Sequence, residues 1–202
     1  MTVDSKHVAA LVLAAGEGTR MKSGLPKAVH RVLGIPMVRL VADALERAGV
    51  ARKVFVTGHG AEAVETVLPG RTFVRQEQRL GTGHAAMCAA EALSDFDGSL
   101  LVLSGDTPLL RPETMAGLVS AREISGASAV VLTAMMADPT GYGRVIRDSG
   151  GLLSAIVEQK DLEGEQASIR ECNTGTYCFD ARALFDSLDA LSSENAQGEY
   201  YL

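Results

Sequence analysis

The chain alternates short apolar segments with segments of helical periodicity, and this alternation restricts the fold more than any other feature of the sequence. Residues 8–14 form a continuous apolar run, which is typical of a strand buried on both faces of a sheet. Segment 36–48 repeats apolar residues at helical spacing, starts at a proline and is followed by Gly49. The strands expected here are 8–14, 53–57, 72–76 and 100–104, and the helices are 36–48, 61–68, 82–93 and 112–123. We predict an α/β fold with a mostly parallel sheet, helices on both faces and right-handed crossovers.

The pattern changes after residue 128, where strand signals are joined partly by turns such as 148–151. The expected strands are 128–136, 144–148, 152–159 and 171–179. The sequence has no linker, low-complexity run or internal repeat. This part is therefore predicted to be a mixed extension of the same sheet, so that residues 1–202 form one domain.

Composition and charge exclude several classes of protein. Of the 202 residues, 47% are hydrophobic and 22% are charged, which is ordinary for a globular protein. A net charge of −6 argues against a nucleic-acid partner, but a few local cations can still hold a phosphorylated small molecule. We find no apolar run long enough for a membrane span, no signal-peptide pattern at the start, and three cysteines without a CxxC pair. A cytoplasmic protein with reduced, buried thiols and no membrane partner is expected.

The predicted topology brings several loops to one place. In open α/β sheets, ligands bind beyond the carboxyl ends of the strands. The segments that follow these ends are 16–27, 58–60, 76–82 and 105–107. All four are expected to face one crevice.

The first of these segments is rich in glycine and cations, in the string LVLAAGEGTRMKSGLPK at 11–27. It lacks the G-K-[ST] of a Walker A loop, and Met21 occupies the position of the third glycine in a dinucleotide fingerprint. Free N–H groups at Gly16 and Gly18, together with Arg20, Lys22 and Lys27, suit a triphosphate. The glycine pair alone is equally compatible with a tight turn beside solvated cations.

The full string is more specific than the glycine pair. L-A-A-G-x-G-T-R-M followed by L-P-K resembles the signature of the sugar-nucleotide pyrophosphorylases. Further matching stretches follow in order: R-Q-E-Q-R-L-G-T-G-H-A at 75–85, L-S-G-D-T-P-L at 103–109, D-P-T-G-Y-G-R at 138–144, I-V-E-Q-K-D at 156–161, E-C-N-T-G at 171–175 and N-A-Q-G-E-Y-Y at 195–201. Together they resemble the N-terminal uridylyltransferase domain of the bifunctional N-acetylglucosamine-1-phosphate uridylyltransferase and glucosamine-1-phosphate N-acetyltransferase family, over essentially the whole chain.

The resemblance implies a Rossmann-like nucleotidyltransferase fold and a defined reaction. A phosphate oxygen of N-acetylglucosamine 1-phosphate attacks the α-phosphorus of UTP, giving UDP-N-acetylglucosamine and pyrophosphate for cell-wall and lipopolysaccharide precursors. The nucleophile is already an anion, so the reaction depends on positioning and charge neutralisation rather than on a general base.

The resemblance also implies roles for individual residues. Arg20 would grip the triphosphate, Lys27 would lie near the α-phosphate, and Asp106 would bind Mg²⁺, although seen alone Asp106 could simply cap a turn. The implied nucleotide-binding residues are Leu13, Ala14, Ala15, Gly16, Lys27, Gln76, Gly81, Thr82, Ser104 and Gly105. The implied sugar-binding residues are Gly143, Glu158 and Asn173. His84 is expected to serve structure, and Met135 and Met136 are expected to pack in the core.

The match also sets expectations about what the 202 residues leave out. The resembling domain continues past a position equivalent to Leu202 and supplies an asparagine as a second Mg²⁺ ligand. A left-handed β-helix for acetyl transfer and trimer assembly then follows in that family. We therefore expect a C-terminally incomplete domain of a homotrimeric parent, with weakened metal binding and reduced activity. Two alternatives stay open: a nucleotidyltransferase for another sugar or alcohol phosphate, and a non-catalytic nucleotide-sugar-binding module.

Overall fold

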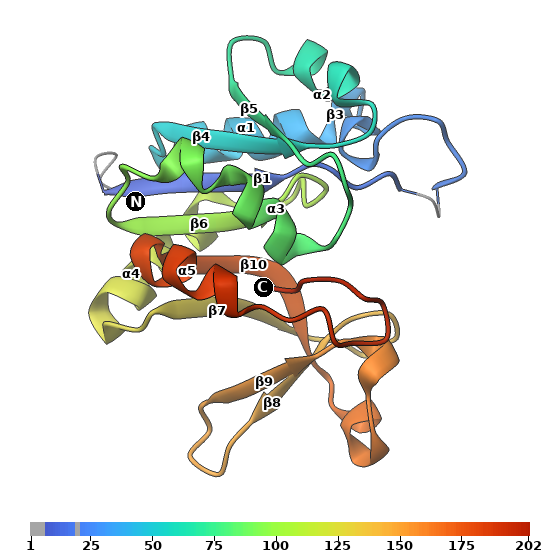
Figure 1. Ribbon diagram of the computed structural model, residues 1–202, viewed down its shortest axis with the longest axis vertical. Coiled ribbons are helices and arrows are strands. Elements are labelled where there is room, and N and C mark those ends of the chain that lie inside the picture. The colour runs from blue at the N-terminus through green and yellow to red at the C-terminus, as the bar shows by residue number, and fades with distance from the viewer. Residues whose placement is uncertain (1–6, 19–20) are drawn as a thin grey trace.

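The computed structural model describes residues 7–18 and 21–202, and it is built around one eight-stranded sheet (Figure 1). The strands lie in the order β5-β4-β1-β6-β10-β8-β9, and β7 pairs with β10. The parallel part consists of β1 (Val8–Leu13), β4 (Arg52–Thr57), β5 (Thr72–Arg75) and β6 (Ser99–Ser104). The predicted mostly parallel α/β sheet is thereby confirmed.

Helices cover both faces of the sheet because the central strands are apolar on both sides. In β1, Val8, Ala10 and Val12 belong to one core cluster, whereas Ala9 and Leu11 belong to the other. The first cluster includes residues of α1, α2 and α4, and the second includes residues of α3 and α5. The helices are α1 (Met37–Ala48), α2 (Ala61–Val67), α3 (Thr82–Ala89), α4 (Pro112–Ser125) and α5 (Ala181–Ser187).

The helix ends follow from local chemistry. Pro36 precedes α1, and Gly49 ends it in the left-handed conformation at φ 88°, where its N–H binds the last carbonyl groups. Pro112 starts α4, and Gly126 ends it at φ 65°. These residues explain why the predicted bounds agree with the structure to within a few positions.

The second half of the chain extends the sheet with antiparallel strands. They are β7 (Ala129–Met135), β8 (Arg144–Arg147), β9 (Leu153–Val157) and β10 (Glu171–Asp180). β10 pairs with β6 through its C-terminal half and with β8 through Cys172, so the β8–β9 hairpin projects from the main sheet (Figure 1). The pairing of β10 with β7 shifts register between Asn173 and Thr176 of β10. Such irregularities re-aim side chains, and this one lies at a predicted site residue.

Several local features differ from the sequence-based expectations. The predicted helix 82–93 stops at Ala89 and continues as a 3₁₀ turn, η3 (Glu91–Leu93). The small hairpin of β2 (Arg31–Val32) and β3 (Ile35–Pro36) was not predicted, because two-residue strands are too short for a clear periodicity. The helix α5 was also not predicted, although the Asp180 side chain caps its start by accepting from Ala183 N–H. Met135 was wrongly assigned to the core: as the last residue of β7 its side chain is 75% exposed, and Met136 is only half-buried.

Cysteine placement agrees with the expectation of free thiols. Cys172 and Cys178 are buried, and Cys88 is half-buried. None of the helices within 7–18 and 21–202 is long and apolar enough to cross a membrane.

Candidate active site

Three of the four segments predicted to face one crevice, 16–27, 76–82 and 105–107, supply residues that line it. The fourth, 58–60, does not, because His59 lines a separate, smaller pocket with Glu17 and residues 23–26. Backbone hydrogen bonds join the segments that leave the parallel strands: Ala14 N–H donates to the Val56 carbonyl at 2.8 Å, and Gly105 N–H donates to the Leu13 carbonyl at 2.8 Å. The crevice has two adjoining lobes. The sheet lobe, of about 620 Å³, lies over the ends of β1 and β6. The hairpin lobe, of about 550 Å³, lies beside β8 and β9.

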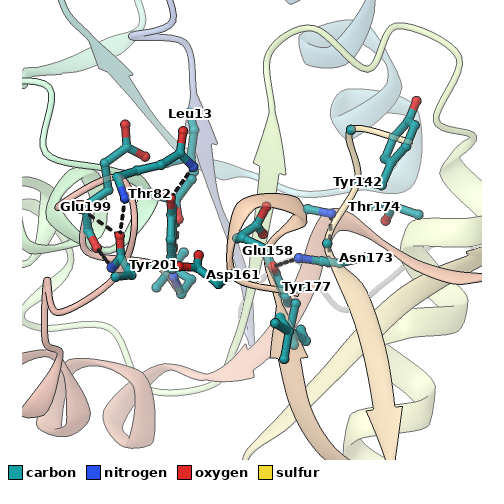
Figure 2. Close-up of a pocket in the computed structure, with 18 of the residues that line it drawn as sticks. Leu13, Thr82, Tyr142, Glu158, Asp161, Asn173, Thr174, Tyr177, Glu199 and Tyr201 are labelled. Atoms are coloured by element: carbon teal, nitrogen blue, oxygen red, sulfur yellow. Dashed lines mark hydrogen bonds between the residues drawn. The ribbon is translucent and has the colours of Figure 1, made fainter. Parts of the chain in front are cut away.

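The two lobes share a boundary, so that one ligand can extend across both. The residues that line both are Leu13, Thr82, Gly141, Tyr142, Thr174, Gly175 and Glu199. They come from the end of β1, the start of α3, the loop before β8, the irregular part of β10 and the segment near residue 200. Figure 2 shows five of them around the hairpin lobe, namely Leu13, Thr82, Tyr142, Thr174 and Glu199.

An ion pair between Lys27 and Asp106 lines the sheet lobe. Lys27 Nζ contacts Asp106 Oδ2, and the Ser104 hydroxyl donates to Asp106 Oδ1. Lys27 is held by its own backbone N–H, which donates to the Gly16 carbonyl at 3.0 Å. Gly18 adopts φ 67°, and a Cβ there would lie 2.9 Å from Lys27 Cβ, so glycine is required for this close approach.

The Asp106 carboxyl is ionised at neutral pH for an identifiable reason. Its burial raises its pKa, but hydrogen bonds from Lys27 and Ser104 favour the charged form and hold the pKa below its ordinary value. The ammonium and carboxylate groups both remain accessible, with 39% and 18% of their side chains exposed. The pair can therefore exchange its mutual contact for phosphate oxygens and a cation.

Gln76 is the buried polar side chain of the sheet lobe. It is 4% exposed, and its Nε2 donates to the Gly81 carbonyl at 3.0 Å and lies 3.0 Å from His84 Nδ1. These contacts fix the amide plane at the edge of the lobe. His84 thus contacts Gln76, in keeping with the structural service expected of it.

The segment near residue 200 closes over the start of α3. Tyr200 N–H donates to the Leu80 carbonyl at 2.7 Å, and Gly83 N–H donates to the Tyr200 carbonyl at 2.8 Å. Gly81 has φ 102°, and a Cβ there would lie 2.3 Å from the backbone carbonyl oxygen of Tyr200. Sequence reasoning recognised the string at 195–201 as a motif but gave it no place in the site.

The three predicted sugar-binding residues lie together in the hairpin lobe. A Cβ on Gly143 would lie 2.8 Å from Glu158 Oε1, and the Gly143 carbonyl accepts from Asn173 N–H at 2.9 Å. Asn173 Nδ2 donates to the Tyr177 hydroxyl at 2.6 Å, and its Oδ1 accepts from Gly175 N–H at 2.9 Å. Figure 2 shows Glu158, Asn173 and Tyr177 beside one another.

The hairpin lobe is acidic. Its carboxylates are Glu158, Asp161, Glu194 and Glu199. Burial, followed by the charges of Asp161 and Glu199, raises the pKa of Glu158. Among the residues described, the lysine and arginine that line the crevice, Lys27 and Arg79, belong to the sheet lobe. Phosphates are therefore favoured in the sheet lobe, and an uncharged, hydroxyl-rich group is favoured in the hairpin lobe.

Most of the predicted residues line one lobe or the other. The sheet lobe contains Leu13, Ala15, Gly16, Lys27, Gln76, Gly81, Thr82, Ser104 and Asp106. Ala14 and Gly105 do not line it, because they pack behind it: a Cβ on Gly105 would lie 3.2 Å from Ala14 Cβ. Arg20 lies outside the described residues. Arg79 was missed, although it lies within a recognised string, and it pairs with Glu17 at 3.1 Å.

Comparison with known proteins places this crevice in a family. A family model described as the MobA-like NTP transferase domain matches residues 10–200. A bifunctional protein GlmU of Heliobacterium modesticaldum is 53% identical over 194 residues, which covers 96% of this chain and 42% of that protein. A protein of the same name from Pelobacter propionicus is 49% identical over 200 residues, which covers 98% of this chain and 44% of that protein.

The chain thus spans less than half the length of these curated relatives. The family match, in contrast, runs through nearly the whole chain, including most of β1, the loop with Lys27, the β8–β9 hairpin and Tyr200. The chain belongs to the family of MobA-like NTP transferase domains, and it is a nucleotidyltransferase.

Proposed function

We propose that the site transfers a uridylyl group from UTP to N-acetylglucosamine 1-phosphate, releasing pyrophosphate and forming UDP-N-acetylglucosamine. The observation that carries the proposal is the division of the crevice: a lobe with Lys27 and Asp106 adjoins a lobe with Glu158 and Asn173. One reactant of such a transfer carries the triphosphate, and the other carries an uncharged sugar. Relatives named bifunctional protein GlmU, about half identical to this chain, support the same reaction.

Lys27 has the central role in the proposed chemistry. The sugar phosphate approaches the α-phosphorus as one anion approaching another, so the barrier falls when positive charge is held at the bond that forms. The Lys27 backbone is anchored by its N–H on the Gly16 carbonyl, and Nζ is held at the lobe by the Asp106 carboxylate, so the ammonium group is already placed where phosphate oxygens would arrive.

Asp106 suits a divalent cation of the kind that accompanies nucleotides. Mg²⁺ in such sites is bound through one or two carboxylates, with substrate phosphates and water completing its shell. Asp106 is partly exposed to the sheet lobe and is kept ionised by its neighbours, which fits this demand. A bound Mg²⁺ would neutralise phosphate charge, and Asp106 would be its ligand from the described residues.

The remaining predicted residues divide between base and sugar. Gln76, clamped by Gly81 and His84, would pair with the imide edge of uracil together with backbone groups of the 81–82 segment. Glu158 would accept hydrogen bonds from sugar hydroxyls. The Asn173 amide retains one N–H and one lone pair after its contacts with Tyr177 and Gly175, and these remain for the acetamido sugar.

The wider assignments rest on the relatives rather than on this site. The product would supply cell-wall and lipopolysaccharide precursors in the cytoplasm. Trimer assembly and acetyl transfer would belong to a part of the parent protein not represented in these residues. The precursor supply, the cytoplasmic location, the trimer and the acetyl transfer all stay predictions.

A pyrophosphate-release assay tests the proposed function directly. UTP, CTP, GTP and dTTP are each offered with N-acetylglucosamine 1-phosphate, glucosamine 1-phosphate and glucose 1-phosphate, with Mg²⁺ present. We expect turnover with UTP and the acetylated sugar phosphate, and calorimetric binding of UTP and UDP-N-acetylglucosamine. Preference for another pair would favour a different nucleotidyltransferase. Binding without turnover would favour a binding module if a chain extended to the length of the relatives also gives no turnover.

A further inference from the structure

A buried arginine lies behind the boundary between the two lobes. Arg144 is the first residue of β8 and is 2% exposed. Its Nη1 donates to the Tyr142 carbonyl, and its Nη2 donates to Gln159 Oε1 at 3.0 Å. Within the part of the chain that the structure describes, Arg144 forms no ion pair, and its Nε is buried without a hydrogen-bond partner. Burial of a charge on these terms is costly, so a purely structural role would be served better by an apolar side chain.

Gln159 joins Arg144 to the segment that carries Glu158. It begins the 3₁₀ turn η4 (Gln159–Asp161) and directly follows Glu158. Its Oε1 accepts from Arg144 Nη2 and also from Gly141 N–H at 2.9 Å. Gln159 Oε1 therefore joins the loop before β8 to the turn beside Glu158 in two ways. One is direct, through Gly141 N–H, and the other runs through Arg144, which also holds the Tyr142 carbonyl.

The loop held in this way forms part of the boundary between the lobes. Gly141 and Tyr142 line both of them, and the Gly143 carbonyl holds Asn173 through its backbone N–H. A movement of this loop would shift the sugar ligands relative to Lys27 and Asp106. Transfer between two substrates depends strongly on such spacing, since a misplacement of about 1 Å can cost about 100-fold in rate.

We infer that Arg144 and Gln159 act together as positioning residues, which set the hairpin lobe at the correct distance from the sheet lobe. Neither residue lines a lobe itself. This inference rests on the proposed function, because it assigns the nucleotide to one lobe and the sugar to the other. It predicts that loss of the unit weakens recognition of the sugar and leaves recognition of the nucleotide intact.

The test compares Arg144→Met with Arg147→Met, a matched change on the same strand. Arg147 is exposed and pairs with Glu171 at 2.6 Å, away from both lobes. We expect R144M to weaken UDP-N-acetylglucosamine binding and to raise the KM for the sugar phosphate, each by about tenfold. UTP binding should stay within about twofold of the unaltered chain, and R147M should change neither ligand. Arg144→Lys should recover part of the loss, because an ammonium group reaches one acceptor but not both.

Gln159→Met provides a second route if R144M does not fold. Q159M should selectively weaken binding of UDP-N-acetylglucosamine. The double variant should bind this ligand no more weakly than the more impaired of the two single variants, because the two residues form one unit. The inference fails if folded R144M and Q159M bind UDP-N-acetylglucosamine normally, or if UTP binding weakens in parallel. It also fails if the losses of UDP-N-acetylglucosamine affinity in the two single variants add in the double variant. If the unaltered chain binds neither UTP nor UDP-N-acetylglucosamine, the proposed function itself fails, and the inference fails with it.

Discussion

The two lobes of the crevice differ in how deeply the strands beside them are buried. The sheet lobe lies at the ends of strands buried on both faces, and five of the six residues of β1 are fully buried. The hairpin lobe lies on β8 and β9, and the first three residues of β9 are exposed. Lys27 and Asp106 thus lie beside the buried core strands, whereas two of the sugar ligands, Gly143 and Glu158, flank the projecting β8–β9 hairpin and Asn173 lies on β10 (Figure 1). In the proposed function, the sheet lobe neutralises phosphate charge, which requires groups that are already in place, and the hairpin lobe selects the sugar.

The largest expected effect comes from removing the cation of the sheet lobe. Lys27→Met should lower kcat for pyrophosphate release by about 100- to 1,000-fold, because it deletes positive charge at the reacting phosphate. Lys22→Met is the matched control, since Lys22 is exposed in the same loop and does not line the lobe. Similar losses in both variants would mean that the general positive charge of the loop matters rather than the position of Lys27.

The second effect concerns the segment that closes over α3. Gly81→Ala should cost about 2 kcal/mol more stability than Gly70→Ala, because a new Cβ collides with the Tyr200 carbonyl. Gly70 also has a positive φ, of 73°, but a Cβ there meets nothing within 4 Å. Urea unfolding of both variants measures this difference, to which the backbone of Gly81 also contributes, because its φ of 102° and ψ of −179° lie in a region that is essentially restricted to glycine. Equal losses would indicate that Tyr200 does not press on Gly81 in solution.

The acidity of the hairpin lobe predicts discrimination against anionic sugars. UDP-N-acetylglucosaminuronate differs from UDP-N-acetylglucosamine by one carboxylate, which would enter a lobe lined by Glu158, Asp161 and Glu199. Calorimetry should show about tenfold weaker binding of the uronate, and the difference should shrink as salt is added. Equal affinities at low salt would show that the sugar is bound elsewhere.

The smallest effect is a pH dependence of opposite sign at two glutamates. Burial and the charges of Asp161 and Glu199 raise the pKa of Glu158 in the folded state. The stability associated with its protonated form is therefore present at low pH and lost as pH rises through the folded pKa. Glu158→Gln should raise Tm at pH 7, and the gain should vanish near pH 4.

Glu171, the first residue of β10, provides the opposite case. A hydrogen bond from Arg147 lowers its pKa, so its stabilising effect is present at neutral pH and lost as pH falls through the folded pKa. Glu171→Gln should therefore lower Tm at pH 7, with the loss shrinking in acid. Shifts of the same sign in both variants would contradict the electrostatic contrast between the hairpin lobe and the surface.

The sheet lobe could be predicted from the sequence far better than the hairpin lobe. The apolar run of β1 and the placement of Gly49 and Gly126 are local signals, and strand order then brings Lys27 and Asp106 to one edge. Glu158 and Asn173 look like ordinary strand-end residues, and only the family resemblance singled them out.

Other parts of the site depend on contacts that no local pattern encodes. Tyr200 reaches the site through hydrogen bonds with Leu80 and Gly83, more than a hundred positions earlier in the chain. Ala14 and Gly105 belong to recognised strings, but they pack behind the lobe because each follows directly from a strand end into the core. The buried unit of Arg144 and Gln159 becomes visible only when the side chains are placed.

A crystal structure of the chain with UDP-N-acetylglucosamine tests the division of the crevice most directly. We predict that the diphosphate lies in the sheet lobe within reach of Lys27, with uracil against Gln76. The acetamido sugar should contact Gly143, Glu158 and Asn173 in the hairpin lobe. A sugar bound beside Lys27 and Asp106, or phosphates bound among the carboxylates of the hairpin lobe, would contradict this account.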